Sequence, residues 1–300
     1  EGTDITPWSN YGKLKNTGVE INLGYRETKR AFKYNIGLNL SHVKNEVLEL
    51  GESFREGGTN GVNRSEKGRS VGDFYVIKTN GIFQSWDEVY AHTTTVTENG
   101  QTVTKLIQPD AHPGDIRYID ANNDGKIDKD DIGIIGNAQP KLSFGFNNTF
   151  TIFDFDLNIF WQGVSGNDIY NQNRIRRETY SSDAFPTSTV MKNHWTPENP
   201  TNIPAFSGAE YVNSSRWVEK GDYLRLKNIT LGYRIPHKIL SKIGCSSARI
   251  YVSANNLWTI TNYSGFDPEA SMGADSDAAG VDRGVYPSSK SFLVGLDISF

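Results

Sequence analysis

One stretch of the sequence has the residue types and spacing of a metal-binding loop. It reads Asp120-Ala-Asn-Asn-Asp-Gly-Lys-Ile-Asp-Lys-Asp-Asp131 and matches the D-x-[DN]-x-[DN]-G pattern of calcium loops. The first, third and fifth positions offer side-chain oxygens, and Gly125 permits the sharp turn that such a loop needs. The expected ligands are Asp120, Asn122, Asp124, the carbonyl of Lys126, Asp128 through a water, and Asp131.

The last position of this loop departs from the usual pattern. Asp131 stands where calcium loops normally carry a glutamate, and the shorter side chain makes a bidentate contact weaker. No long helices are expected on either side, so a helix-loop-helix sensor is not predicted. We expect a structural Ca²⁺ that braces a surface loop, with a metal-free Asn/Asp/Gly turn as the alternative.

Other arrangements that could do chemistry are weaker. The five histidines (42, 92, 112, 194 and 237) lack metal spacing, and the lone Cys245 has no histidine near it in sequence. Asp267 and Glu269 resemble a glycosidase carboxylate pair, but neighbouring acids in such a loop are usually solvated. Since no nucleophile or phosphate-binding motif occurs either, no enzyme activity is predicted. The loop aromatics either stack on sugar or pack loops together, so substrate-binding residues stay unassigned: Trp86, Tyr90, Tyr170, Tyr180, Trp195 and Trp217.

Composition narrows the class of protein. The 300 residues carry a net charge of −4, so the sequence lacks the excess of positive charge that is typical of nucleic-acid-binding proteins. No run approaches the apolar length of a membrane-spanning helix, and mean hydropathy is −0.53. Membrane strands remain compatible with 36% apolar residues, because such strands are half polar.

The end of the chain shows the clearest strand pattern. In the segment 290–300, apolar residues occupy every second position from Phe292 to Phe300, and most residues between them are small or polar. Strict alternation predicts a strand with one apolar and one polar side, and its length suits a membrane crossing. The segment ends on the aromatic Phe300, and in this it resembles the closing strand of a bacterial outer-membrane barrel.

Six further segments alternate in the same way. The segments 17–26 and 31–45 are expected to pair as a hairpin, with aromatic residues beside its turn and aliphatic residues further away. This order is typical of membrane strands, which place aromatic rings at headgroup depth and aliphatic residues deeper. Short and long connections alternate along the chain, as the short periplasmic turns and long extracellular loops of outer-membrane barrels do. The residues 46–140 are expected to form one long extracellular insertion that holds the calcium-type loop 120–131. The other four segments are 141–150, 152–163, 221–235 and 247–260.

Seven strands cannot close a membrane barrel. Bacterial barrels have an even number of strands starting at about eight, and an open sheet would leave backbone groups unpaired in lipid. The chain also opens without a methionine or a signal peptide. We therefore expect it to be the C-terminal part of a larger barrel, without the plug domain.

Several motifs together resemble one family. They include Asn16-Thr-Gly-Val-Glu20, Asn80-Gly-Ile-Phe-Gln84, the stretch from Pro113 to Asp128, Ile135 to Pro140, Gly221 to Tyr233 and Asn255-Asn-Leu-Trp258. In this order they resemble the C-terminal third of SusC/RagA-type TonB-dependent outer-membrane transporters, over nearly the whole chain. The resemblance implies an all-β, roughly 22-stranded antiparallel barrel around a plug. It also implies energy from the TonB complex through the missing N-terminal part, and a SusD-like surface lipoprotein that captures oligosaccharide or peptide.

Two readings from other classes remain open at this point. The chain could be a secreted, calcium-braced β-sandwich that binds carbohydrate, or a glycoside hydrolase. Burial separates the first of these from a barrel, because a sandwich packs its apolar strand faces against a second sheet.

Overall fold

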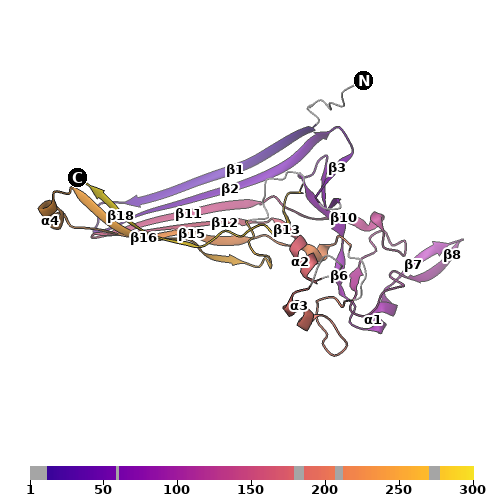
Figure 1. Ribbon diagram of the computed structural model, residues 1–300. Helices are drawn as coiled ribbons and strands as arrows, with labels where there is room; N and C mark the ends of the chain where they lie inside the picture. Colours follow the sequence, from indigo (N-terminus) through magenta and orange to yellow (C-terminus); the bar gives the residue numbers. More distant parts are fainter. Residues whose placement is uncertain (1–11, 59–60, 179–185, 207–211, 270–277) are drawn as a thin grey trace, which may run out of the picture.

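A computed structural model shows one sheet of seven long antiparallel strands with a folded layer at one end (Figure 1). It describes residues 12–58, 61–178, 186–206, 212–269 and 278–300. Each long strand overlaps one of the segments chosen from alternation, although β2 continues to Leu50 instead of ending near 45. In spatial order they are β1 (Gly12–Glu27), β2 (Phe32–Leu50), β11 (Leu142–Ile152), β12 (Phe155–Ser165), β15 (Tyr223–Arg234), β16 (Ser247–Thr261) and β18 (Ser291–Ser299).

Short and long connections lie at opposite ends of this sheet (Figure 1). The short ones are 28–31, the pair Phe153 and Asp154, and 235–246, which contains α4 (His237–Leu240) and η4 (Ser241–Ile243). Phe153 was expected inside a strand, and that expectation is wrong. Its φ of +51° and 82% exposure place it in the two-residue turn, where the hairpin needs positive φ.

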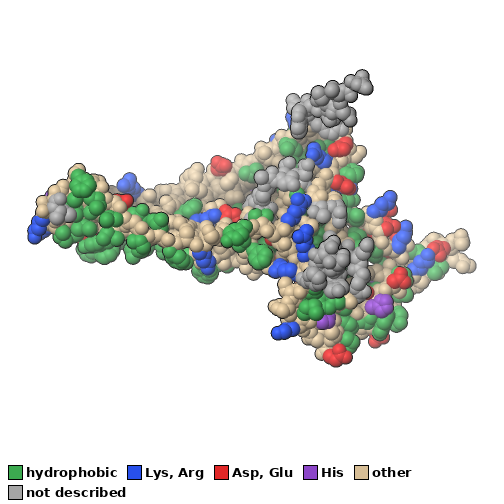
Figure 2. All heavy atoms as spheres, in the orientation of Figure 1, with side chains coloured by type: hydrophobic (Ala, Val, Ile, Leu, Met, Phe, Trp, Pro, Cys, Tyr) green, Lys and Arg blue, Asp and Glu red, His purple; other side chains and the backbone are tan. Residues whose placement is uncertain are grey.

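The apolar side of the sheet is exposed, unlike an ordinary hydrophobic core. One cross-strand row runs Tyr34–Phe150–Leu157–Leu231–Val252–Val294. Its last three side chains are 46%, 49% and 78% exposed, and Figure 2 shows hydrophobic side chains gathered along the strands. An apolar surface that extends over several strands marks contact with something outside this chain.

Aromatic rings collect where the strands meet the short turns. Phe32 lies 5.7 Å from Tyr34 and 5.9 Å from Phe150, while Phe155 and Tyr233 are 4.8 Å apart between ring centres. This is the gradient that the sequence predicted, with rings beside the turns and aliphatic residues further along.

The opposite end of the sheet carries a layer of shorter elements, here called the cap. It contains the four-stranded sheet β10-β5-β4-β3, the three-stranded sheet β14-β13-β17 and two strand pairs within the described residues. The strand bounds are β3 (Phe54–Gly57), β4 (Asn63–Glu66), β5 (Asp73–Ile77), β6 (Thr79–Ile82), β7 (Thr93–Glu98), β8 (Gln101–Leu106), β9 (Ile116–Tyr118), β10 (Ile132–Asn137), β13 (Asp168–Asn171), β14 (Val218–Lys220) and β17 (Val281–Asp282). The helical elements are α1 (Trp86–Ala91), α2 (Gln172–Glu178), α3 (Ser188–Asn193), η2 (Lys129–Asp131) and η3 (Ser215–Trp217).

The cap holds the largest buried cluster of the described chain. Phe74 and Val76 from the 46–140 insertion pack with Tyr170 and Trp217 from the next long connection and Val281 from the last one. Apolar residues of the insertion thus find partners in the other two long connections. No helix in the described residues is long and apolar enough to cross a membrane.

Glycine on the polar side of the sheet makes room for a tyrosine. The register aligns Asp156, Gly232, Tyr251 and Gly295 across four strands. The Tyr251 ring covers Gly295, where an added Cβ would lie 2.2 Å from the ring Cζ. Arg249 lies over the same ring and donates hydrogen bonds of 3.0 and 2.6 Å to Asp156.

This packing yields a prediction about the closing strand. Gly295→Val should destabilise the full-length protein by about 1–3 kcal/mol, because the new side chain displaces a packed ring. Thermal unfolding in detergent, followed by far-ultraviolet circular dichroism, measures the effect. Gly24→Val is the matched control, since a Cβ there meets nothing nearer than 4.0 Å. Equal melting temperatures for the two variants would contradict the prediction.

Candidate functional site

The calcium-type loop folds around its own backbone amides. The Asp120 carboxylate accepts hydrogen bonds from the amides of Asp124 (3.2 Å) and Gly125 (2.9 Å), and Asn122 also accepts from Asp124 (3.0 Å). Asp131 accepts from the amides of Ala121 (2.7 Å) and Asp128 (2.8 Å). Gly125 has φ +87°, so the sharp turn lies where the sequence put it.

Lys126 places its ammonium against the acids of this loop. Its Nζ lies 2.9 Å from Asp128 and 3.6 Å from Asp124, and hydrogen bonding to Asp128 raises the lysine pKa. The amide of Asp130 and the Lys126 ammonium lower the pKa of Asp128 in turn. The residues predicted as ligands thus share one turn. In the described part of the chain, however, no three acidic, histidine or cysteine side chains converge as a metal site.

The other candidates separate into buried and exposed groups. Tyr170, Trp195 and Trp217 are buried and pack the cap, while Trp86 and Tyr90 stack on each other at the surface. Tyr180 lies outside the described residues. The histidines do not meet: His42 contacts the carbonyl of Lys141, His92 the ring of Phe83, and His194 the carbonyl of Met191.

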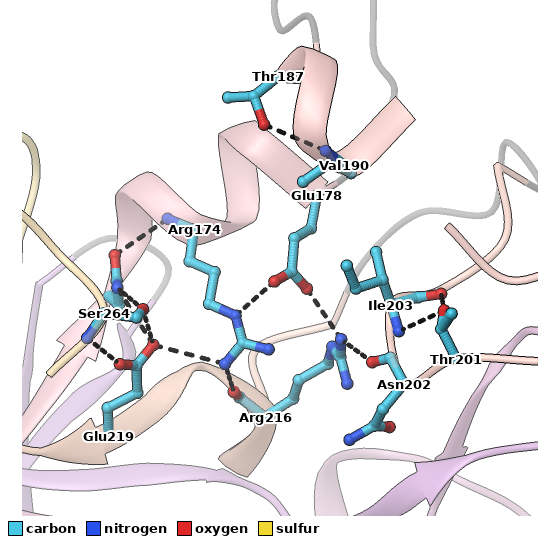
Figure 3. Close-up of polar contacts among 11 residues, drawn as sticks. Arg174, Glu178, Thr187, Val190, Thr201, Asn202, Ile203, Arg216, Glu219 and Ser264 are labelled. Atoms are coloured by element: carbon cyan, nitrogen blue, oxygen red, sulfur yellow. Dashed lines mark hydrogen bonds and ion pairs between the residues drawn. The ribbon is translucent and has the colours of Figure 1, made fainter. Parts of the chain in front are cut away.

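Four charged residues form a network that ties cap segments together (Figure 3). Glu178 accepts hydrogen bonds from both Arg174 and Arg216, at 2.5 and 2.8 Å. Arg174 reaches Glu219 at 3.4 Å, and Glu219 accepts from the backbone amide and hydroxyl of Ser264, each at 2.8 Å. Burial lowers the pKa of Arg216, while Glu178 acts in the opposite direction. The network joins the connection 163–220 to the start of 262–289.

A second ionic cluster anchors the last long connection to the sheet. Arg225 of β15 donates to Asp267 at 2.5 Å and to Glu269 at 2.7 Å, and Lys227 also binds Glu269 at 2.7 Å. Arg225 and Asp267 are each 3% exposed. Asp267 and Glu269 were expected to be solvated acids, and that expectation is wrong, because both are ion-paired to Arg225. The sequence offered one signal for this cluster, the two basic residues Arg225 and Lys227 near the start of a strand. Nothing in the sequence, however, indicated that they pair with acids about forty positions further along the chain.

The pKa of Asp267 reflects opposing influences. Burial acts to raise it, but hydrogen bonds from Arg225 and from the amides of Ser288 and Glu269 together lower it. Because Asp267 and Ser288 lie near the two ends of the connection 262–289, one carboxylate holds both ends of this segment. We call the contacts of Arg225, Lys227, Asp267 and Glu269 the latch.

The polar side of the sheet is lined by amides and hydroxyls. Asn228 donates to Ser253 (3.0 Å) and Asn255 (2.8 Å), and Asn158 donates to Asn147 (3.3 Å) and Thr149 (3.0 Å). Near the latch this side also contains a hollow of about 620 Å³. Such a wall can bind a polar ligand or another polar segment of protein.

The latch yields a prediction about the last connection. Arg225→Met should weaken attachment of the segment 262–289 by about 3–5 kcal/mol, because it leaves the Asp267 carboxylate buried without its partner. Limited proteolysis of the full-length protein measures the change as faster cleavage inside that segment. Lys227→Met is the matched control, since Lys227 binds the same Glu269 from a more exposed position and should cost about 1 kcal/mol or less. Equal cleavage rates for both variants would count against the latch.

The lowered pKa of Asp267 also predicts a pH dependence. A carboxylate whose pKa falls on folding stabilises the structure above its unfolded value of about 3.9, and that contribution disappears as the pH drops through the lowered value. Cleavage within 262–289 should therefore stay constant from neutral pH to about pH 5, and increase only near and below pH 4. The measurement uses an acid-tolerant protease, with Asp267→Asn as the control. A rise in cleavage already at pH 6 would contradict this assignment.

No protein-family model matches the chain. Among curated proteins, TonB-dependent receptor P3 of Formosa agariphila is 31% identical over 306 residues, which cover 97% of this chain and 29% of that protein. TonB-dependent receptor SusC of Bacteroides thetaiotaomicron is 22% identical over 306 residues, which cover 97% of this chain and 27% of that protein. The chain therefore spans less than a third of the length of the relatives it matches.

The fold has close counterparts among solved structures. The RagAB peptide transporter superposes with a TM-score of 0.73 at 23% identity, over 97% of this chain and 30% of that chain. The RagAB peptide importer in its 'closed-closed' state gives a TM-score of 0.70 at 22% identity, over 97% of this chain and 30% of that chain. The resemblance drawn from sequence motifs and the all-β fold class are both confirmed. By sequence the chain belongs with the TonB-dependent receptors, and its fold is that of a segment of a SusC/RagA-type transporter barrel.

Proposed function

We propose that the full-length protein is a TonB-dependent importer of a nutrient across the outer membrane, and that this chain forms the C-terminal part of its barrel wall. The exposed apolar side of the seven-stranded sheet is the observation that carries the proposal. In a bilayer that side meets lipid tails, while the amides and hydroxyls of the other side face a watery lumen.

The dimensions of the exposed side suit a membrane. Ile250 and Ile260 are both exposed on β16 and ten residues apart, about 33 Å along a strand. At the tilt of about 40° usual in membrane barrels, this corresponds to a band about 25 Å tall. Aromatic rings lie at both limits, with Phe155 and Tyr233 near the turns and Trp161 and Trp258 toward the cap.

Partners follow from the same family membership. A SusD-like lipoprotein would meet the cap from outside and deliver oligosaccharide or peptide, and the TonB complex would act through segments that this chain lacks. The curated relatives are named as receptors, and the solved counterpart is described as a peptide transporter. Neither name implies hydrolysis, and we propose that the protein carries out transport without chemistry on its substrate.

Fractionation and deletion of the gene test this function. The full-length protein should appear in detergent extracts of the outer membrane, together with a surface lipoprotein. Its deletion should abolish growth on one class of oligosaccharide or peptide, in a manner that also requires TonB. Recovery of the full-length protein in the soluble fraction would refute the proposal and favour the secreted β-sandwich. That alternative already conflicts with the exposure of Leu231, Val252 and Val294.

We further propose that the loop 120–131 binds Ca²⁺ and braces the cap on the extracellular side. In its support, Asp120 and Asp131 are buried with their oxygens on one turn, and Gly125 has the required conformation. Asp120, Asn122, Asp124, the Lys126 carbonyl, Asp128 and Asp131 would hold the ion. The Lys126 ammonium opposes binding, because it already lies beside two of these acids.

The position of Lys126 yields a prediction. Lys126→Met should raise calcium affinity several-fold, because it removes a competing cation and keeps the backbone carbonyl. Asp124→Ala should abolish binding, because it removes a side-chain ligand. Calorimetric titration of the full-length protein with calcium measures both effects. Absence of binding at about millimolar calcium in the wild type and in Lys126→Met would rule out the site.

A further inference from the structure

One short connection of the sheet is folded, while the other two are turns without helices. The chain between β15 and β16 contains α4 and η4, and it ends at Gly244, whose φ of +73° turns the backbone toward β16. Leu240 of α4 is 3% exposed and packs with Cys245, Ala248 and Ile235. A connection with its own buried cluster has a fixed position at the end of the sheet.

This cluster places α4 over the apolar side of the sheet. Ile235 lies two positions after Tyr233, Ala248 lies two positions before Ile250, and Tyr233 pairs with Ile250. The amide of Ile235 donates a hydrogen bond of 2.9 Å to the carbonyl of Ala248, so both residues continue the exposed apolar alternation. Because Leu240 packs on these two residues, α4 lies on the side that the proposed function turns toward lipid.

The segment of α4 and η4 exposes both apolar and basic side chains. Ile239 is 57% exposed beside the buried Leu240, and Lys238 and Lys242 are exposed as well. Neither lysine forms an ion pair with the described residues. Figure 2 shows hydrophobic and basic side chains together at the end of the molecule where Figure 1 places α4. This combination suits the boundary between acyl chains and phosphate headgroups.

The charge of the short connections favours an anionic lipid. The connection 235–246 carries two lysines and no acidic residue, and the connection 28–31 carries one lysine, one arginine and no acidic residue. The third short connection, Phe153 and Asp154, adds a single acid. Basic residues therefore outnumber acids at this end, although the whole chain has a net charge of −4. Clustered lysines and arginines beside a membrane attract anionic headgroups.

A hollow of about 360 Å³ lies between α4 and the ends of the neighbouring strands. Its lining includes apolar, hydroxyl and basic side chains, namely Leu240, Ala248, Ser246, Ser247, His237 and Arg234. Asp297 also lines it and pairs with Arg249 at 3.5 Å. The Arg234 side chain is 63% exposed and reaches Asp156 only at 3.8 Å. Guanidinium and hydroxyl groups donate hydrogen bonds to phosphate oxygens, so this hollow fits a headgroup beside an apolar wall.

We propose that α4 binds an anionic phospholipid of the periplasmic leaflet and so anchors this end of the barrel wall in the membrane. Ile239 enters the acyl chains, Lys238 and Lys242 bind the phosphate, and the hollow beside Arg234 accepts the headgroup. The inference rests on the proposed importer function, which sets the orientation of the sheet. It goes beyond that function, because the passage of a nutrient does not require a lipid site.

Lipid binding to the purified full-length transporter in detergent tests the charge requirement. The probes are phosphatidylglycerol and the zwitterionic phosphatidylcholine, and native mass spectrometry measures bound lipid. Phosphatidylglycerol should bind more tightly. Lys238→Gln combined with Lys242→Gln should weaken its tightest binding by about tenfold or more, because each lysine near the headgroup contributes to attraction. The matched control, Lys67→Gln combined with Lys192→Gln, removes the same charge from exposed positions of the cap and should change binding less than about twofold.

A soluble competitor separates a lipid site from a general anion site. Glycerol phosphate in excess should not displace phosphatidylglycerol, because it lacks the acyl chains that Ile239 contacts. Displacement by glycerol phosphate overturns the proposal, as do equal binding of the two lipids and equal effects of the two double variants.

A fluorescent label tests the depth of α4 in the membrane. Ile239→Cys, labelled with an environment-sensitive maleimide dye in nanodiscs of the full-length transporter, should emit as in an apolar medium and be quenched by lipids that carry a spin label near the headgroup. Gln101→Cys on the β7–β8 hairpin is the water-exposed reference. The parent protein serves as the blank, because its Cys245 is buried.

Emission from position 239 that matches the reference, without quenching by lipid, overturns the proposal. Growth that still depends on the gene and on TonB would then leave the importer function intact. Loss of outer-membrane localisation would instead refute the function itself.

Discussion

The whole structure depends on one constraint: a strand in lipid must pair every backbone amide and carbonyl and must present only apolar side chains outward. Antiparallel pairing from β1 to β18 meets the first requirement for the five inner strands. Alternation meets the second, since rows such as Leu157–Leu231–Val252 face one side and Asn158–Thr230–Ser253 the other. The two edge strands each lack one neighbour within this chain. A barrel of about 22 strands, of which this chain is one segment, would supply both.

The cap is organised by a different balance of forces. It forms an ordinary buried core around Phe74, Tyr170 and Trp217. Two ionic clusters then fix the long connections. Glu178 and Glu219 join cap segments to one another, and Asp267 joins the last connection to the sheet through Arg225. Because the cost of removing both charges from water offsets much of their attraction, these clusters set geometry more than they add stability. The hollow on the polar side of the sheet depends on that geometry, because the latch holds Glu269 at its rim.

The sequence allowed prediction of what is periodic or local. Alternation located the long strands, and Gly125 located the sharp turn of the calcium-type loop. Contacts between segments that lie far apart in the sequence do not produce a comparable pattern in it. Burial of Trp217, pairing of Arg225 with Asp267 and the position of Gly145 beneath Phe160 depend on strands that meet only in the folded chain. Phe153 shows the reverse case, in which an apolar residue fitted the alternation yet lies in an exposed turn.

The central claim is that neighbouring residues on one strand face lipid and water in turn. Spin labels introduced singly at Leu231, Val252 and Ile250 of the full-length protein in bilayers test it directly, beside labels at Thr230, Ser253 and Tyr251. The account predicts that the first three collide mainly with oxygen dissolved in lipid, and the second three with a water-soluble nickel chelate. Immobile labels at Leu231 and Val252, shielded from both reagents, would show that protein covers the apolar side and would contradict the account.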